Sequence, residues 1–349
     1  MEAEAGWRQR CGSKIIRKPF FGNGVELTGM KRLLFIYNPL AGKGMIRNSL
    51  SDILEEFSSG GYEVVVHPTT GSMDAARAVE ECGASFDLIV CGGGDGTLDE
   101  VVTGMQTGRF SRPIGYIPSG STNDYASSLR IPKKMRMAAR AVMDGSVFSC
   151  DIGRMNDNYF VYVAAFGAFV NVSYDTPQDM KNLLGHLAYL VRGAQSLPSL
   201  KSYHMHYESL ENSGTDDFML GMITNSNSVG GFEGITGRDV TLNDGVFEVT
   251  LIRMPPMLAV EWPGILGALI GGTENKNVIT FKTSRLELWF DQPVSWTKDG
   301  EYGGDHSHLV IENIPQALPI LIPQKEKENL LPLQREGGEL NESLKNLSI

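Results

Sequence analysis

The sequence predicts an α/β protein in which a Rossmann-like parallel-sheet region precedes an antiparallel β-sandwich region. The first observation is an alternation of short apolar runs with helix-period segments from Leu33 onward, which is typical of βαβ units. The second is a change after about Cys150 to extended runs separated by hairpin-like turns. The third is the length of 349 residues, which favours two globular domains over one.

The first region is expected to form four parallel strands joined by helices. The predicted strands are 33–37, 63–67, 88–91 and 114–117, and the predicted helices are 45–57, 73–81, 98–105, 123–129 and 135–144. In such a sheet the carboxyl ends of the strands share one edge, where ligands bind. The turns after these strands are therefore the places to look for a functional site.

The second region is expected to be antiparallel, with a helical insertion at 180–197 whose leucine stripe faces the core. Its turns fall at 155–158, 211–214 and 243–245, and its strands at 203–208, 218–224 and 246–252. The predicted organisation is an N-terminal extension (1–30), an α/β domain (31–150), a β-sandwich domain (151–307), a terminal strand segment returning toward the first domain (308–323) and a polar tail (324–349).

Composition excludes several classes of protein. A formal net charge of -10 argues against a nucleic-acid binder, whose surface would be basic. The most apolar segment, 257–270, contains Glu261 and Pro263 and falls short of the roughly 18 residues that a transmembrane helix needs. The four cysteines show no CxxC spacing, which favours reduced thiols in a cytoplasmic protein.

The most informative motif is the run GGGDGTLDE at 92–100, between an apolar strand and a helix. Glycines at a strand-to-helix junction let backbone N–H groups converge on an anion, and the helix N-terminus adds partial positive charge. Asp95 within the turn is suited to hold a metal that accompanies phosphates. The run is neither a Walker A loop nor a GxGxxG turn, and the alternative is a glycine-rich turn without a ligand.

Two further turns occupy equivalent positions in the sheet. NPLAGKG at 38–44 follows the first strand, and PSGSTND at 118–124 follows the fourth. Taken singly, the hydroxyls and acid of the second turn could serve only as helix N-caps. Three such turns at one sheet edge favour a shared phosphate site.

NPLAGKG, GGGDGTLDE and PSGSTNDYA, in this order and spacing, resemble the diacylglycerol kinase catalytic-domain family, which includes bacterial diacylglycerol kinases and sphingosine kinases. The resemblance runs from about Lys31 to about Pro323 and continues through 151–153, 224–231, 242–245 and 299–301. Related GGDGT kinases that act on NAD or sugar phosphates lack the Ser-Thr-Asn-Asp turn and the late Asp-Gly-Glu.

The resemblance implies a fold of the NAD kinase/diacylglycerol kinase type and an ATP- and Mg²⁺-dependent lipid kinase. Diacylglycerol is the first-choice acceptor, with phosphatidic acid as product. Another lipid alcohol, such as a sphingoid base or monoacylglycerol, is the alternative acceptor. A nucleotide-binding regulator without activity is the alternative of another class, and intact Asp95, Asp124 and Asp299 argue against it.

The resemblance also assigns site residues. Asp299 matches the general base, with Glu301 as the second candidate, and Asp95, Asp124 and Asp151 match acids that hold Mg²⁺ through water. The residues that match the nucleotide site are Asn38, Pro39, Leu40, Ala41, Gly42, Thr69, Gly93, Gly94, Asp95, Gly96, Thr97, Leu98, Asp99 and Ser121. Family members usually carry Asn in place of Asp99 and Thr in place of Ser121.

Two further sites are expected outside the phosphate turns. Asp244 matches a structural metal site to which the carbonyls of Thr241 and Val246 contribute, and a type I′ hairpin turn at 243–245 is the alternative. A membrane-facing patch is expected from the basic cluster Arg130, Lys133, Lys134, Arg136 and Arg140, and a solvated helix face is its alternative. The patch would place the protein peripherally at the inner face of the membrane. Oligomeric state stays open, with a homodimer among the options.

Overall fold

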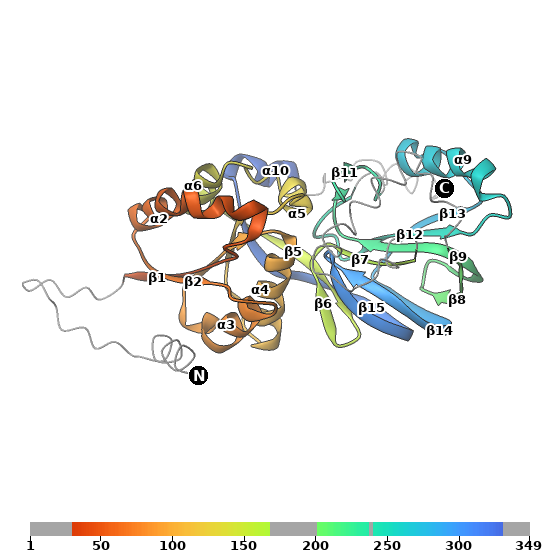
Figure 1. Ribbon diagram of the computed structural model, residues 1–349, viewed down its shortest axis with the longest axis horizontal. Coiled ribbons are helices and arrows are strands. Elements are labelled where there is room, and N and C mark those ends of the chain that lie inside the picture. The colour runs from red at the N-terminus through yellow and green to blue at the C-terminus, as the bar shows by residue number, and fades with distance from the viewer. Residues whose placement is uncertain (1–29, 168–200, 237–239, 331–349) are drawn as a thin grey trace, which may run out of the picture.

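The computed structural model describes residues 30–167, 201–236 and 240–330. A mixed α/β fold is present, and the α/β class is confirmed. Figure 1 shows a helix-flanked sheet region at one end of the molecule and a strand-rich region at the other. The predicted helical insertion at 180–197 and the N-terminal extension lie outside the described residues.

A parallel sheet forms the first region. Its strands run in the order β2 (Tyr62–Pro68), β1 (Lys31–Tyr37), β3 (Leu88–Gly93) and β4 (Ile114–Pro118), and all three pairings are parallel. Helices α2 (Leu50–Ser59) and α6 (Met135–Asp144) cover one face, and α3 (Asp74–Cys82) and α4 (Asp95–Thr107) cover the other (Figure 1). Because both faces are covered, β1 and β3 are apolar along most of their length and buried.

The first connection differs from the prediction. Instead of a helix over 45–57, a 3₁₀ segment, η1 (Ala41–Ser49), precedes α2. Gly42, Lys43 and Gly44 have φ values of 53°, 61° and 75° and lie in the left-handed region, which is incompatible with a regular helix. The short helices η2 (Gly83–Ser85) and α5 (Asp124–Ser128) complete the connections of this region.

The second region is antiparallel, as predicted. The sheet path β13–β12–β9–β7–β14–β15 comprises β13 (Val278–Thr283), β12 (Phe247–Arg253), β9 (Ser213–Thr224), β7 (Val163–Gly167), β14 (Arg285–Lys298) and β15 (Glu301–Ile322). The remaining elements are β5 (Ser146–Met155), β6 (Asn158–Phe160), β8 (Tyr203–Glu208), the hairpin β10 (Ser228–Val229) and β11 (Phe232–Glu233), and helix α9 (Leu258–Gly271). A β-sandwich arrangement of these strands stays a prediction.

Strand β15 connects the two regions. It pairs antiparallel with β14 and β5, and near its end Ile320 pairs in parallel with Ile114 of β4. The segment 308–323 is thus the second part of one long strand that starts at the Asp-Gly-Glu turn. No observation fixes the predicted domain boundaries, which stay predictions.

Two expectations are wrong, that of a hairpin turn at 243–245 and that of reduced thiols throughout. Residues 243–245 do not form a type I′ hairpin turn, because φ is positive only at Gly245 and β12 pairs with β9 and β13. Cys91 and Cys150 are free and buried, but Cys82 is disulfide-bonded. The start of the predicted polar tail forms η4 (Gln324–Glu326) and α10 (Lys327–Leu330).

Within the described segments, no helix combines the length and the hydropathy that crossing a membrane requires.

Candidate active site

The three glycine-rich turns and the Asp-Gly-Glu turn meet around one cavity of about 170 Å³. It is lined by Asn38, Ala41, Gly42, Gly94, Asp95, Gly96, Thr97, Gly120, Ser121, Thr122, Tyr162, Asp299, Gly300 and Glu301. Segments far apart in the sequence come together here because β1, β3 and β4 end at the same sheet edge. The turn between β14 and β15 reaches this edge from the second region.

Glycines let the three turns approach one another closely. A Cβ atom on Gly42, whose φ is 53°, would lie 2.0 Å from the Ser119 carbonyl oxygen. A Cβ atom on Gly120 would lie 2.6 Å from Cα of Gly94. Side chains larger than hydrogen are excluded at these positions, so backbone groups face the cavity.

Helix α4 begins at Asp95, directly at the cavity, and runs for 13 residues. Its N-cap residue Gly94 offers no side-chain cap, and the first N–H groups of a helix have no acceptor within the helix. Together with the helix dipole, these N–H groups favour an anion at this place.

Asp95 and Asp124 are buried side by side. Oδ2 of Asp95 accepts the backbone N–H of Asp124 at 3.0 Å, and Oδ1 accepts the hydroxyl of Tyr116 at 3.3 Å. Burial and the Asp124 carboxylate raise the pKa of Asp95 to about 7. Carboxylate oxygens such as these are the hard donors that Mg²⁺ prefers.

Asp124, at the start of α5 in the first region, is held by the β10–β11 hairpin of the second region. Its Oδ1 accepts the Ser228 hydroxyl at 2.6 Å and the Gly231 N–H at 2.9 Å, and its Oδ2 accepts the Gly230 N–H at 2.9 Å. Three charge-assisted hydrogen bonds therefore hold this acid in one orientation.

Asp299 is 3% exposed and accepts three backbone N–H groups, from Val161 at 2.5 Å, Tyr162 at 2.9 Å and Val163 at 3.0 Å. Its own φ of 48° places the residue in the left-handed region, in a turn completed by Gly300. Burial and the Asp99 carboxylate raise the pKa of Asp299, against the opposing effects of Lys298 and the N–H donors. A raised pKa makes a carboxylate a stronger base.

Glu301 also lines the cavity, two residues beyond Asp299. A Cβ atom on Gly96 would lie 2.9 Å from Oε1 of Glu301, so this carboxyl group lies against the start of α4. Both candidates for the base are thus within the same cavity.

Asp99 lies behind the cavity and pairs with a residue that the motifs did not single out. Its Oδ2 is 2.5 Å from Nζ of Lys298, and the two side chains are 4% and 13% exposed. Burial lowers the pKa of Lys298, but the carboxylates of Asp99 and Asp299 outweigh this and raise it. The ion pair links α4 to the strand that carries the Asp-Gly-Glu turn.

Proteins of known sequence and of known structure resemble this chain. A diacylglycerol kinase of Bacillus subtilis (strain 168) is 34% identical over 306 residues, which cover 86% of this chain and 99% of that protein. The chain belongs to the diacylglycerol kinase family. The diacylglycerol kinase catalytic domain matches residues 32–155, and a diacylglycerol kinase of Staphylococcus epidermidis (strain ATCC 12228 / FDA PCI 1200) is 31% identical over 84% of this chain and 93% of that protein.

A solved diacylglycerol kinase structure from Bacillus anthracis (strain Sterne) has the same fold. Its TM-score is 0.71 at 21% sequence identity, with 85% of this chain and 98% of that chain covered. The long-range arrangement of strands in this member of the diacylglycerol kinase family is therefore shared with an experimentally determined relative.

Not all the predicted site residues of this diacylglycerol kinase family member line the cavity. Pro39, Leu40, Thr69, Gly93, Leu98 and Asp99 are absent from its wall. Leu40 is 70% exposed, Leu98 is buried in the core, and the Thr69 N–H pairs with the Tyr37 carbonyl at 2.9 Å beside the sheet edge. Conversely, Tyr162 and Thr122 line the cavity, and Tyr162 lies in no motif from which this position could be predicted.

Asp151 and Asp124 do not line the cavity in this kinase family member, and Asp151 has hydrogen-bond partners of its own. Its Oδ1 accepts the Gln316 N–H and its Oδ2 the Gly245 N–H, both at 2.7 Å. Burial, with Asp244 contributing, raises the pKa of Asp151 despite these N–H donors. Among the residues that the structure describes, no group of three His, Cys, Asp or Glu side chains is arranged for a metal ion.

The surroundings of Asp244 contain oxygen donors and one cation. Oδ1 of Asp244 accepts the Val246 N–H at 3.3 Å, and Oδ2 is 3.7 Å from Nζ of Lys282, which is also 3.0 Å from Oε1 of Glu248. The buried Oδ1 of Asn243 has no hydrogen-bond partner.

The basic cluster is largely neutralised by ion pairs. Arg136 contacts Glu56 at 2.8 Å and Glu55 at 3.2 Å, and Arg140 contacts Glu56 at 3.0 Å. Arg130 contacts Glu326 of η4 at 3.1 Å. Lys133 and Lys134 remain as exposed cations, without an ion pair to any of the described residues.

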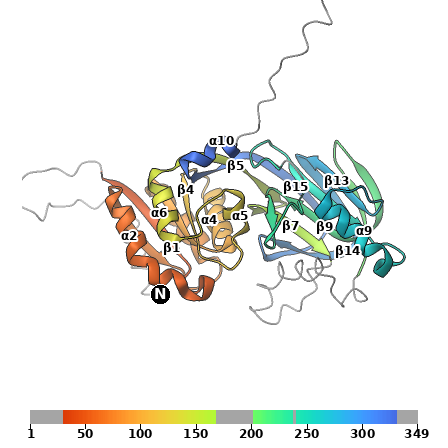
Figure 2. The same ribbon diagram turned by 90° about the horizontal axis from the view of Figure 1, so that it is seen from above.

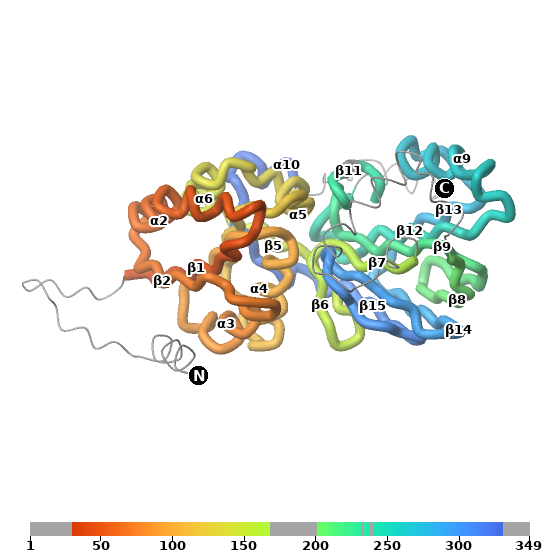
Figure 3. Tube along the Cα trace, viewed as in Figure 1, coloured from red at the N-terminus to blue at the C-terminus, as the bar shows by residue number. Residues whose placement is uncertain are grey.

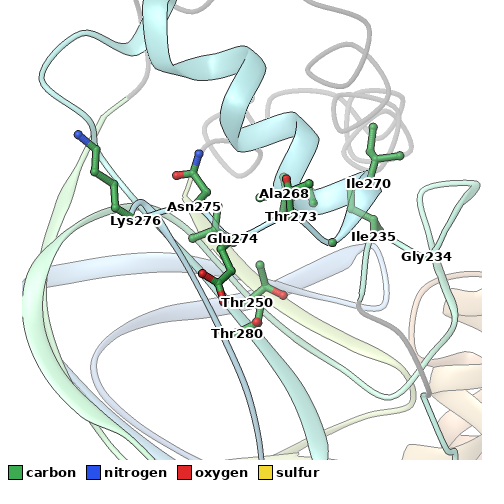
Figure 4. A pocket seen from close by; sticks show the side chains of 13 residues that line it. Gly234, Ile235, Thr250, Ala268, Ile270, Thr273, Glu274, Asn275, Lys276 and Thr280 are labelled. Carbon is green, nitrogen blue, oxygen red and sulfur yellow. The ribbon is translucent and has the colours of Figure 1, made fainter.

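A second, larger cavity of about 890 Å³ lies between α9 and the strands β12 and β13. In Figure 4, Thr250 and Thr280 point into it from the sheet, while Glu274, Asn275 and Lys276 lie at the loop that follows α9. Apolar side chains of α9, including Ala268 and Leu269, contribute to its wall. The wall thus combines apolar and polar surface.

Proposed function

We propose that the chain is an ATP- and Mg²⁺-dependent lipid kinase that transfers the γ-phosphate to a lipid hydroxyl, with diacylglycerol as acceptor and phosphatidic acid as product. The observation that carries this proposal is the convergence of three anion-binding turns and the Asp299–Glu301 turn on one cavity. Membership of the diacylglycerol kinase family supports the choice of acceptor.

The turns fit a nucleotide. The N-terminus of α4 and the closely packed glycines Gly42, Gly94 and Gly120 offer backbone N–H groups where phosphates would lie. The polar groups of Asn38, Thr97 and Ser121 line the same cavity. These residues would bind and orient the phosphates, which is the main contribution that a protein makes to phosphoryl transfer.

The paired carboxylates of Asp95 and Asp124 fit Mg²⁺. Mg²⁺ is usually held by one or two carboxylates together with substrate phosphates and water, so a cluster of three acids is not required. When bound, the ion would neutralise phosphate charge. Asp151 accepts the N–H groups of Gly245 and Gln316, and Asp244 contributes to its raised pKa, so we place it with the Asp244 site instead.

Asp299 would take the proton of the acceptor hydroxyl. The three N–H donors fix its carboxylate, and Asp299 lines the cavity in which the phosphates would lie.

We further propose that the acyl chains of the acceptor occupy the cavity between α9 and the sheet, because its wall includes apolar side chains. Such an enzyme would work at the inner face of the cytoplasmic membrane.

Phosphate transfer tests this proposal directly. The purified chain is incubated with radiolabelled ATP, with and without a Mg²⁺ chelator, and with diacylglycerol, monoacylglycerol and sphingoid bases in turn. Labelled phosphatidic acid that requires Mg²⁺ is the expected product. Labelling of another lipid alcohol alone would change the acceptor, and labelling of none would favour the regulator without activity.

Gly94→Val is expected to weaken ATP binding by about tenfold or more, because a β-branched side chain would stand where the backbone approaches the phosphates. A Cβ atom at this position lies 3.3 Å from Cα of Gly120, which is tighter than an ordinary contact. Isothermal titration calorimetry measures the affinity. Gly71→Val is the matched control, since a Cβ atom at Gly71 meets nothing within 4 Å. Equal affinities for the two variants would remove the phosphate site from this turn.

Asp244→Ala is expected to abolish the dependence of the melting temperature on added Mg²⁺ if Asp244 holds a structural metal, because a ligand that binds only the folded state stabilises it by mass action. Differential scanning calorimetry over a Mg²⁺ series measures this. The nearby Lys282→Met should increase the Mg²⁺ response, since its ammonium group competes at 3.7 Å from Asp244. An unchanged response in Asp244→Ala would exclude the site.

A further inference from the structure

Helix α9 has a solvent-exposed face without a single polar or charged side chain. The exposed positions within the helix are Ala259, Val260, Pro263, Gly264, Ile270 and Gly271. At 100° per residue these positions fall on one side of the helix. Val260 and Ile270 are 66% and 59% exposed, and Met257, just before the helix, is 64% exposed.

Such a surface is unusual for a helix that faces water. The outer face of a surface helix normally carries charged and polar residues, and a helix that is apolar all round is normally buried in protein or lipid. The inner side of α9 is packed in the usual way, with Trp262 and Ile265 buried. Ile270, at the end of the helix, is 59% exposed and also borders the cavity between α9 and the sheet (Figure 4).

The one charged residue of α9 is neutralised within the protein. Oε2 of Glu261 lies 3.2 Å from Nζ of Lys276 and accepts a hydrogen bond from Nδ2 of Asn277 at 2.8 Å. The helix therefore presents no net charge to a partner, which an apolar environment requires.

Cations lie on the same side of the molecule as α9. Lys133 and Lys134 directly precede α6, and Figures 1 and 2 show α6 and α9 on one common side. These lysines are exposed and have no ion pair with the described residues. A protein with a net charge of -10 approaches an anionic surface only through such a cationic area.

The length of α9 determines how it can meet a lipid layer. Fourteen residues span about 21 Å, whereas a hydrocarbon core of about 30 Å requires about 20 residues. Gly272, with φ of 65°, ends the helix by donating its N–H to the Ala268 carbonyl at 2.9 Å. The helix is thus suited to lie in the plane of the interface.

We propose that α9 is the membrane-contact element of this protein and lies in the surface of an anionic phospholipid leaflet. Met257, Val260 and Ile270 enter the acyl region, while Lys133 and Lys134 contact head-group phosphates. The inference rests on the proposed function, because a leaflet is where a diacylglycerol acceptor is found.

Sedimentation with vesicles of phosphatidylcholine and phosphatidylglycerol, without nucleotide, tests the proposal. The double variant Met257→Asp/Val260→Asp should lower the partition coefficient by about tenfold or more, since two apolar side chains lose their burial in lipid. Leu210→Asp is the matched control, because Leu210 is 96% exposed in the turn between β8 and β9 and lies outside this surface. Lys133→Glu/Lys134→Glu should weaken binding at low salt only.

Activity separates this inference from the proposed function. Met257→Asp/Val260→Asp, which leaves the wall of the cavity between α9 and the sheet unchanged, should lose activity on vesicle-embedded diacylglycerol and keep it on a short-chain, water-soluble diacylglycerol. If wild type phosphorylates no lipid alcohol but sediments through α9, only the proposed function fails. Equal sedimentation of the double variant and wild type overturns the inference. The inference is also overturned if the wild type is a dimer, the double variant is a monomer and both bind vesicles equally. In that case α9 is a contact between two copies of the chain.

Discussion

Asp299→Asn is expected to lower turnover by about 10² to 10⁴ while ATP affinity stays near the wild-type value, because general-base catalysis contributes about this factor. Asn cannot accept the proton of the lipid hydroxyl. It nevertheless keeps one oxygen that can accept the N–H groups of Tyr162 and Val163, so the turn is retained in part. Steady-state kinetics on a short-chain diacylglycerol, together with calorimetric ATP binding, measure the two quantities.

Glu301→Gln provides the comparison for this variant. Glu301 lines the same cavity two residues away, and it does not carry the three N–H contacts that fix Asp299. If Asp299 is the base, Glu301→Gln should reduce turnover much less than Asp299→Asn does. The reverse order would transfer the role of base to Glu301.

Lys298→Met is expected to destabilise the folded protein by about 3 to 5 kcal/mol, because it leaves the Asp99 carboxylate buried without its partner. The Asp99 side chain is 4% exposed, so water cannot replace the ammonium group. Urea denaturation followed by circular dichroism measures the change. The turn that carries Asp299 adjoins Lys298, so activity should fall as well.

The double variant Asp99→Asn/Lys298→Met distinguishes loss of a buried pair from loss of packing. It removes both charges of the buried pair, so most of the lost stability should return. A double-mutant cycle then gives the coupling free energy of the pair. If the double variant is as unstable as the sum of the single variants, the two side chains do not depend on each other.

Local pattern was sufficient to predict most of the first region and the catalytic turns. The apolar runs that become β1, β3 and β4 are buried on both faces, and such strands are readily recognised from sequence. The turns follow these strands directly, so their meeting at one edge follows from the parallel order. Asp95, Ser121 and Asp299 line one cavity for this reason.

Contacts between distant segments could not be predicted in the same way. Lys298 and Asp99 are 199 residues apart, and Arg136 and Glu56 are 80 apart, so neither ion pair has a local signature. The position of Asp151 against Gly245 and Gln316, outside the cavity wall, depends on the path of β5, which a motif does not describe. The left-handed residues after β1 were also missed, because Lys43 gives no signal for a positive φ.

The path of β15 has a consequence for how the chain acquires its shape. The strand runs from Glu301 at the cavity to Ile322 (Figure 1). Near its end it pairs antiparallel with β5 and, through Ile320, in parallel with β4. A pairing such as Ile320 with Ile114 joins residues separated by most of the described chain, and contacts of high sequence separation form slowly. During synthesis the sheet of the first region emerges well before the strand that completes it. Nascent chains that stop before β15 should therefore have an open sheet edge and a half-built cavity, and they should be the species that chaperones and proteases encounter.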